Sequence, residues 1–344
     1  MKQKTIVYAN TIDYDQPLQQ RPHHLMKYFS ENGYMVYWVN YTQRTDKVRD
    51  RISDTLEVYH NWEVFLKRHP KVDIYFSSWA MRHTDLESIK ADLVVYDSLD
   101  NFPENEHEED NMVSKADILL AASKPLLELR SKQHKNVHLV RNACFKKLGD
   151  LDFPIPEDLI PYTKKNKPIV LFSGALTSNW CDLLLLEKVA KKYQVFVVGL
   201  PWGIKEMPKG VHYLGSKGYL ELQAYYRHAD VTLLPFQRCQ ISDFSNPLKV
   251  YESLAHGTPV VATDIPEMDD YEDVVFVSRN HKEFIKNIHK AIKVSKCIEY
   301  KNKAKKMAKN NSWDDRFEII NSAIKEFFKG EKDEKGSTFN NAIL

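Results

Sequence analysis

The sequence predicts an α/β protein with two doubly wound, parallel-sheet domains that face a common cleft. Short apolar strands alternate with helices over residues 5–143, and the same alternation starts again at residue 168. A polar stretch with several prolines, residues 145–167, interrupts the pattern. Strand–helix alternation indicates parallel sheets with helices on both faces, and 344 residues are enough for two such domains. We therefore expect a linker near residues 145–167.

In the first half, each predicted strand is an apolar run that ends in a polar or glycine-bearing segment. The strands are expected at residues 5–10, 34–40, 72–78, 92–98, 116–123 and 138–143, and helices at 21–32, 62–68, 82–90, 105–115 and 125–133. Leu25, Met26 and Phe29 have the spacing of one helix face, and Gly33 ends that helix.

The second half repeats the plan. Strands are expected at residues 168–174, 195–199, 211–215, 230–236, 259–263 and 274–278, with helices at 181–193, 219–228, 245–256 and 312–328. In open sheets of this kind, ligands bind at the carboxyl ends of the strands, so both halves should present those ends to the cleft.

Composition points to an ordinary globular protein. Hydrophobic residues make up 43% and the net charge is +2, which does not favour general nucleic-acid binding. The four cysteines are far apart and form no metal-binding spacing, so we expect reduced thiols and no metal site. No signal peptide or membrane-spanning run is evident, and we expect a cytoplasmic location. The lysine-rich stretch 286–309 offers a possible peripheral contact with an anionic membrane.

The most informative stretch is residues 243–264, DFSNPLKVYESLAHGTPVVATD. Ser245 or Asn246 is expected to cap a helix with Pro247 at its first position, and Gly257 to end it. Free amides at a helix start, together with the ammonium of Lys249, suit a phosphate. A carboxylate three residues further on suits sugar hydroxyls. This pattern predicts a site for the phosphate and ribose of a nucleotide.

The same stretch resembles the donor-site motif of bacterial glycosyltransferases with the two-domain GT-B fold. It is most similar to the family-4-like and teichuronic-acid or xanthan-type branch, whose motif runs roughly N-P-L-K-x-Y-E-Y-L-A-x-G-x-P-V-V. The resemblance implies that Lys249 contacts the donor diphosphate and that Glu252 binds the ribose. Many family-4 relatives carry another glutamate where this chain has Phe244.

The resemblance also implies the domain plan. Residues 1–150 would be the acceptor-binding domain and 165–311 the donor-binding domain. Residues 312–329 would form a helix that returns to the first domain, and 330–344 a disordered tail.

Further donor contacts are expected at the strand ends of the second half. Gly174 would let backbone amides approach the phosphates, and Arg238 is a candidate second cation. The nucleotide base would meet neighbouring loops, and the family favours uracil there. The complete set of donor-binding candidates is Lys249, Glu252, Gly174, Ser245, Asn246, Pro247, Leu248, Arg238, Gly199, Leu214, Gly215 and Tyr219.

In GT-B enzymes the acceptor binds the first domain, so the general base should come from there. Asp100 and Asp97 follow an apolar strand, where a carboxylate faces the cleft. Asp100 is the first candidate, Asp97 the second, and His24 a further catalytic candidate. Arg21 and His23 are candidate acceptor contacts, Arg21 for an anionic acceptor. A capping role for either aspartate, or plain packing for the histidines, is an open alternative.

The resemblance thus implies a metal-independent glycosyltransferase that moves a sugar from a nucleotide donor, with UDP as the expected nucleotide, to a glycan or lipid-linked acceptor. No separate cofactor is expected, and the setting implied is bacterial surface polysaccharide synthesis. Two alternatives are a UDP-sugar 2-epimerase on the same fold and a non-catalytic partner in a polysaccharide assembly complex.

Overall fold

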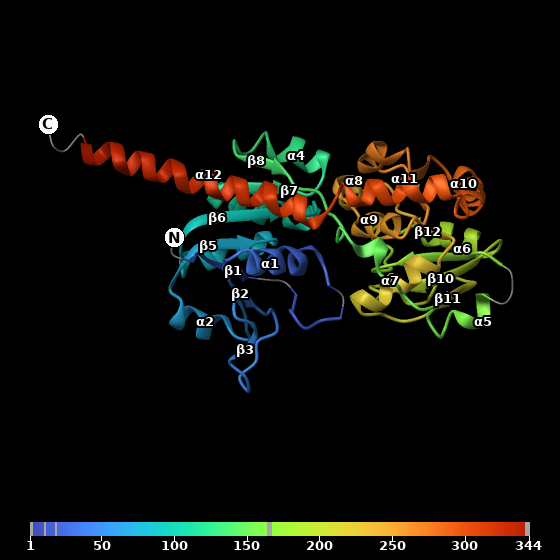
Figure 1. Ribbon diagram of the computed structural model, residues 1–344, viewed down its shortest axis with the longest axis horizontal. Helices are drawn as coiled ribbons and strands as arrows, with labels where there is room; N and C mark the ends of the chain where they lie inside the picture. Colours follow the sequence, from blue (N-terminus) through green and yellow to red (C-terminus); the bar gives the residue numbers. More distant parts are fainter. Residues whose placement is uncertain (1–2, 10–11, 18, 164–166, 341–344) are drawn as a thin grey trace.

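The computed structural model describes residues 3–9, 12–17, 19–163 and 167–340, with side chains up to Gly330. Within these residues the chain forms two α/β domains side by side, and helix α12 (Trp313–Asn340) leaves the second domain and lies along the first (Figure 1). None of the helices described is both long and apolar enough to cross a membrane.

The first domain is built on an eight-stranded sheet with the order β3-β4-β2-β1-β5-β6-β7-β8. All neighbouring strands are parallel except the β3–β4 pair. The strands are β1 (Thr5–Ala9), β2 (Met35–Val39), β3 (Arg49–Ser53), β4 (Leu56–Tyr59), β5 (Lys71–Ser77), β6 (Lys90–Ser98), β7 (Ile118–Ala121) and β8 (Val137–Leu139). The helices are α1 (Arg21–Glu31), α2 (Trp62–Arg68), α3 (Glu106–Lys115) and α4 (Lys124–Arg130), with short 3-10 turns η1 (Ala80–Glu87) and η2 (Pro103–Asn105).

The antiparallel β3–β4 hairpin was not predicted. Its outer strand, Arg49–Ser53, is mostly exposed and carries two arginines and an aspartate. Charged residues on an edge strand prevent pairing with other chains, but they also remove the apolar alternation by which strands are identified in a sequence.

The second domain has a six-stranded, entirely parallel sheet with the order β11-β10-β9-β12-β13-β14. Its strands are β9 (Ile169–Ser173), β10 (Gln194–Val198), β11 (Val211–Tyr213), β12 (Val231–Leu234), β13 (Val260–Thr263) and β14 (Val275–Ser278). The connecting segments are η3 (Leu148–Asp150), α5 (Ile160–Thr163), α6 (Leu183–Ala190), α7 (Tyr219–His228), α8 (Gln240–Phe244), α9 (Leu248–Ala255), η4 (Pro266–Tyr271), α10 (His281–Val294) and α11 (Ile298–Lys309). Two doubly wound sheets therefore confirm the predicted fold class.

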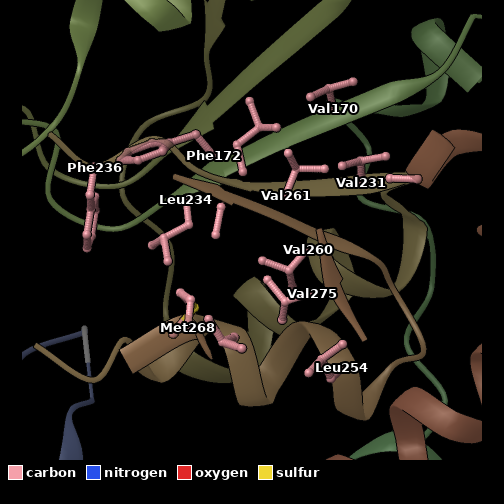
Figure 2. Packing of buried hydrophobic residues seen from close by; sticks show 14 of the residues in the cluster. Val170, Phe172, Val231, Leu234, Phe236, Leu254, Val260, Val261, Met268 and Val275 are labelled. Atoms are coloured by element: carbon pink, nitrogen blue, oxygen red, sulfur yellow. The ribbon is translucent and has the colours of Figure 1, made fainter. Parts of the chain in front are cut away.

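The core of the second domain explains why α9 keeps its place. Leu254 of α9 points toward Val260 and Val275 of the sheet, and Phe172 and Phe236 lie near the strand ends (Figure 2). These side chains are almost completely buried. Each buried side chain of this size contributes about 1.5–3 kcal/mol to folding, so the sheet holds the inner face of the helix firmly.

Gly257 ends α9 as the sequence predicted. Its φ is +75°, and the amides of Gly257 and Thr258 donate to Leu254 O and Ser253 O at 2.9 and 3.0 Å. This is the Schellman arrangement, in which a glycine adopts the left-handed conformation.

Helix α12 fixes the second domain to the first. Trp313, Phe317, Ile320 and Ile324 recur at helical spacing and are buried in the core of the first domain. The hydroxyls of Tyr28 and Tyr34 donate to Asp314 and Asn321 at 3.0 and 2.8 Å. The helix continues to Asn340, beyond the predicted end at 329, and residues 341–344 lie outside the described part.

Candidate active site

A cavity of about 270 Å³ lies between the two domains, at the carboxyl ends of strands from both sheets. Its lining consists of Gln19, Gln20, Arg21, Leu99, Asp100, Asn142, Ser173, Gly174, Ala175, Trp180, Tyr219, Leu222, Tyr226, Asn246, Leu248, Lys249 and Glu252. A second cavity of about 190 Å³ shares Asp100, Trp180, Asn246 and Lys249 with it. Of the candidate residues, Gly174, Lys249 and Glu252 therefore meet Asp100 in one cleft.

Lys249 points into this cleft from the first turn of α9. Its ammonium group donates to the carbonyl of Ser173 and lies 4.6 and 5.4 Å from the ring centroids of Phe172 and Phe236. Burial lowers the pKa of Lys249 to about 8. A cation held against one carbonyl and two ring faces is poorly compensated, so an anionic ligand would stabilise it.

Glu252 lies on the same side of α9, three residues further on, and is 3% exposed. Its Oε1 is buried without a hydrogen-bond partner among the described residues. Burial raises the pKa of Glu252 to about 7, and the nearby hydroxyls of Tyr226 and Tyr219 only partly oppose this. No ion pair joins Glu252 to Lys249 within the described chain, so each group has spare capacity to bind a ligand.

The start of α9 differs from the prediction. The helix begins at Leu248, Pro247 occupies the N-cap position, and no side chain caps it. Asn246 instead bonds Asn142, Tyr251 and Glu267, while the hydroxyl of Ser245 donates to Ser242 O. The expected cap by Ser245 or Asn246 was wrong, because Ser245 bonds the preceding turn and Asn246 bonds tertiary partners. The first amides of α9 are left free of side-chain acceptors.

Gly174 and Gly199 let two strand ends approach each other closely. Their φ angles are +107° and +144°, and a Cβ on Gly199 would lie 2.0 Å from Gly174 O. A Cβ on Gly174 would lie 3.0 Å from Lys249 Nζ. Only glycine fits at either position, and Gly174 thereby leaves room for the ammonium group.

Gly199, Leu214 and Gly215, on the loops expected to meet the nucleotide base, lie outside the lining of these two cavities. The amide of Gly199 donates to Gly215 O at 2.9 Å, and that of Leu214 to Val197 O at 2.9 Å. Leu214 packs against a buried cluster of the second domain. Arg238 is half exposed and pairs with Asp243 at 2.5 Å, also away from the cavities.

The two candidate aspartates have different surroundings. Asp97 is fully buried and accepts two hydrogen bonds of 2.8 Å from the guanidinium of Arg21. Asp100 lines both cavities, and burial raises its pKa to about 6. Since Arg21 engages Asp97 on both oxygens, Asp100 is the aspartate available to a ligand.

The two histidines lie beside the cleft rather than in it. His24 packs against Phe145, Tyr219 and Trp313 at ring distances of 5.0, 4.9 and 5.1 Å. His23 lies 4.7 Å from the Trp38 ring. Both line a separate, wider cavity that the donor cavity meets at Tyr219.

The polar lining residues that were not identified as candidates from the sequence include Ser173, Asn142 and Tyr226. The hydroxyl of Tyr226 lies 2.7 Å from Ser173 Oγ and is also a neighbour of the Glu252 carboxyl group. Tyr226 follows Tyr219 by seven residues on α7, so both are on one helix face. That spacing could have indicated a shared role, whereas Asn142 gives no such signal.

The chain is similar to a known family model and to several solved structures. Residues 167–293 match the family model of group 1 glycosyl transferases. The sucrose-phosphate synthase of Thermosynechococcus elongatus has a similar structure, with TM-score 0.73 and 13% identity over 95% of this chain and 100% of that chain. The chain has the GT-B fold.

Two further GT-B neighbours are similar over nearly their full length. A glycosyltransferase of Rickettsia africae has TM-score 0.64 and 14% identity, covering 96% of this chain and 100% of that one. Anabaena HepE, whose structure is a complex with UDP, has TM-score 0.66 and 12% identity over 94% and 100%. No curated protein sequence matches the chain. Family match and fold together support a GT-B glycosyltransferase.

Proposed function

We propose that this GT-B protein transfers a sugar from a UDP-linked donor, bound in the interdomain cleft, to a glycan acceptor of bacterial surface polysaccharide synthesis. One observation carries the proposal: Lys249 and Glu252 lie on one turn of α9 in the cleft, where Glu252 Oε1 is buried without a hydrogen-bond partner among the described residues and the Lys249 ammonium group has the carbonyl of Ser173 as its acceptor. Burying a charged group without a partner is costly, and folding tolerates it where a ligand supplies the partner.

The donor diphosphate is assigned to Lys249 and the free amides of Leu248 and Lys249. A helix start and an ammonium group stabilise the charge that develops on the leaving nucleotide. Glu252 would accept hydrogen bonds from the two ribose hydroxyls, and Gly174 would admit the phosphates. UDP in the HepE structure and the similarity to the teichuronic-acid and xanthan-type motif both favour uridine as the nucleoside.

Asp100 is assigned as the general base. It lies in the same cavities as Lys249, makes no hydrogen bond within the described residues, and comes from the opposite domain. Asp100 would take the proton of the acceptor hydroxyl, whose oxygen attacks the anomeric carbon from the face opposite the leaving nucleoside diphosphate, and this gives inversion. Because Lys249 and the helix amides supply positive charge, transfer would not require a metal ion, and chelator should leave the rate unchanged.

Exposed lysines of α10 and α11 are the proposed contact with an anionic membrane surface, including Lys286, Lys290 and Lys306. Sedimentation with vesicles that contain phosphatidylglycerol, at low and high salt, tests this contact independently of catalysis.

A thermal-shift comparison of UDP-, GDP-, dTDP- and ADP-sugars tests the donor assignment. UDP-sugars should stabilise the protein most, and Lys249→Ala should remove that shift. Incubation of the preferred UDP-sugar without acceptor should leave the sugar unchanged, whereas an isomerised sugar would indicate an epimerase. Binding with no transfer to any acceptor would indicate a non-catalytic partner.

A further inference from the structure

A wide cavity of about 750 Å³ lies beside the donor cavity, on the side of the first domain. It is bounded by α1, the β3–β4 hairpin and the start of α7, and it shares Gln19 and Tyr219 with the donor cavity. A ligand in the wide cavity could therefore reach the donor past Tyr219.

Three buried polar atoms on the lining of this cavity lack partners. They are His23 Nε2, His24 Nε2 and the hydroxyl of Tyr219, in residues that are 5%, 1% and 7% exposed. A buried polar group without a hydrogen-bond partner destabilises the folded protein. Three of them around one cavity form a built site whose partners a ligand would supply.

The site is not made for an anion. Burial lowers the pKa values of His23 and His24 to about 4 and about 3, so both rings are neutral. Among the described lining residues Lys27 is the cation, and it pairs with Glu31 at 3.8 Å. Glu221 adds a further negative charge to the lining, although it pairs with Lys217 at 3.4 Å. Arg21, the expected anion contact, pairs with Asp97, and its unpartnered Nη1 belongs to the lining of the donor cavity and not to that of the wide cavity.

The rest of the lining suits a sugar chain. The rings of Tyr14, Phe145 and Tyr219 offer flat apolar faces, and the hydroxyls of Ser30 and Thr55 lie on the hairpin side. Pyranose rings combine apolar C–H faces with hydroxyls at their edges, so aromatic faces and neutral polar groups complement them. The volume is within the range of sites that enclose ligands larger than one sugar.

We propose that this wide cavity is the acceptor site and that it takes the end of an uncharged oligosaccharide, at least two sugars long. The inference rests on the proposed function, since it names the acceptor of that transfer. Neutral imidazole nitrogens bind the sugar hydroxyls, and the aromatic rings stack on the sugar faces. Phosphorylated sugars and uronates are excluded, because no unpaired cation on the described lining meets their charge.

Gly218 permits a specific test. It lines the cavity, has φ −65°, and a Cβ there would meet no atom within 4 Å. Gly218→Phe therefore fills the cavity without backbone strain, and Gly218→Ala is its matched control. Saturation-transfer NMR with UDP present measures the binding of four uncharged tetrasaccharides: cellotetraose, maltotetraose, galactotetraose and chitotetraose. Tetragalacturonate and glucose 6-phosphate are the anionic probes.

At least one uncharged tetrasaccharide should bind, more tightly than either anionic probe. Gly218→Phe should weaken that binding at least tenfold, Gly218→Ala less than twofold, and UDP affinity should be unchanged in both. Preference for an anionic probe, no binding of any uncharged tetrasaccharide, or binding unaffected by Gly218→Phe would each overturn the acceptor assignment. If the unsubstituted protein does not bind UDP, the proposed function itself is refuted. Failure of the acceptor assignment and failure of the proposed function are therefore distinguishable.

Discussion

Asn142 of the first domain and Asn246 of the second are joined by two hydrogen bonds just before α9 begins. The Asn142 amide donates to Asn246 Oδ1 at 2.8 Å, and the Asn142 side chain donates to Asn246 O. Asn246 Nδ2 also donates to Tyr251 and Glu267, at 3.0 and 2.9 Å. Arg141 pairs with Glu267 at 2.6 Å. This interdomain contact places the helix start, and therefore Lys249, opposite Asp100.

Replacing Asn246 should weaken both fold and donor binding. Asn246→Ala leaves the backbone amide of Asn142 without its acceptor and removes one hydrogen bond each from Tyr251 and Glu267, which should cost about 1–3 kcal/mol in urea unfolding. UDP affinity should fall too, because the start of α9 is no longer fixed. Asn302→Ala, on the exposed side of α11, is the control. Unchanged stability would show that the contact does not position the helix.

Lys249→Ala should reduce UDP affinity by about 1.5–3 kcal/mol, the scale of a lost charged hydrogen bond. Calorimetry measures the loss, and Lys293→Ala, at an exposed position of α10, should have no effect. Equal affinities of the Lys249 variant and the unsubstituted protein would refute the phosphate contact.

UDP affinity should decrease as pH rises above 8. The pKa of Lys249 in the free protein is lowered to about 8, so above that pH the amine is neutral and must take up a proton to meet the diphosphate. Calorimetry at pH 9 in two buffers of different ionisation enthalpy should reveal this uptake. Lys249→Ala should abolish the buffer dependence. Persistence of that dependence would assign the proton to another group.

Glu252→Gln should stabilise the free protein while weakening UDP binding. The folded-state pKa of about 7 exceeds the ordinary value of 4.5, so the folded protein binds the extra proton and its stability falls as pH rises between these values. The glutamine variant lacks this loss of stability and should gain about 3 kcal/mol in the free energy of unfolding at pH 8. Chemical unfolding at pH 5 and pH 8 measures the gain, and calorimetry the weaker binding. Lower stability at both pH values would mark the glutamate as structural.

Asp100→Asn and Asp97→Asn should separate a catalytic role from a structural one. Asp100→Asn should keep UDP binding and abolish transfer, and the rate of the unsubstituted enzyme should rise with pH through about 6 as Asp100 loses its proton. Asp97→Asn leaves the Arg21 guanidinium buried without its carboxylate and should cost about 3–5 kcal/mol of stability. Full transfer activity in Asp100→Asn would assign the base elsewhere.

Much of the fold could be predicted because the sheets are parallel and buried on both faces. Their strands are continuous apolar runs such as Ile169–Ser173, and Gly257 marks the end of α9. The β3–β4 hairpin could not be predicted, because its charged edge strand lacks that pattern. The predicted helix cap was wrong because Asn246 bonds residues distant in the sequence, Asn142 and Glu267, and the Ser245 hydroxyl bonds the preceding turn at Ser242 O.

The sequence by itself determined the two-sheet plan and the helix that carries Lys249 and Glu252, because local periodicity and one short motif specify both. Only the tertiary structure decided between Asp97 and Asp100, since a carboxylate's availability depends on the Arg21 side chain 76 residues away along the chain. It also decided what Arg21, His23 and His24 face. The pairing of Arg21 and the burial of both histidines depend on packing between segments that are far apart in the chain.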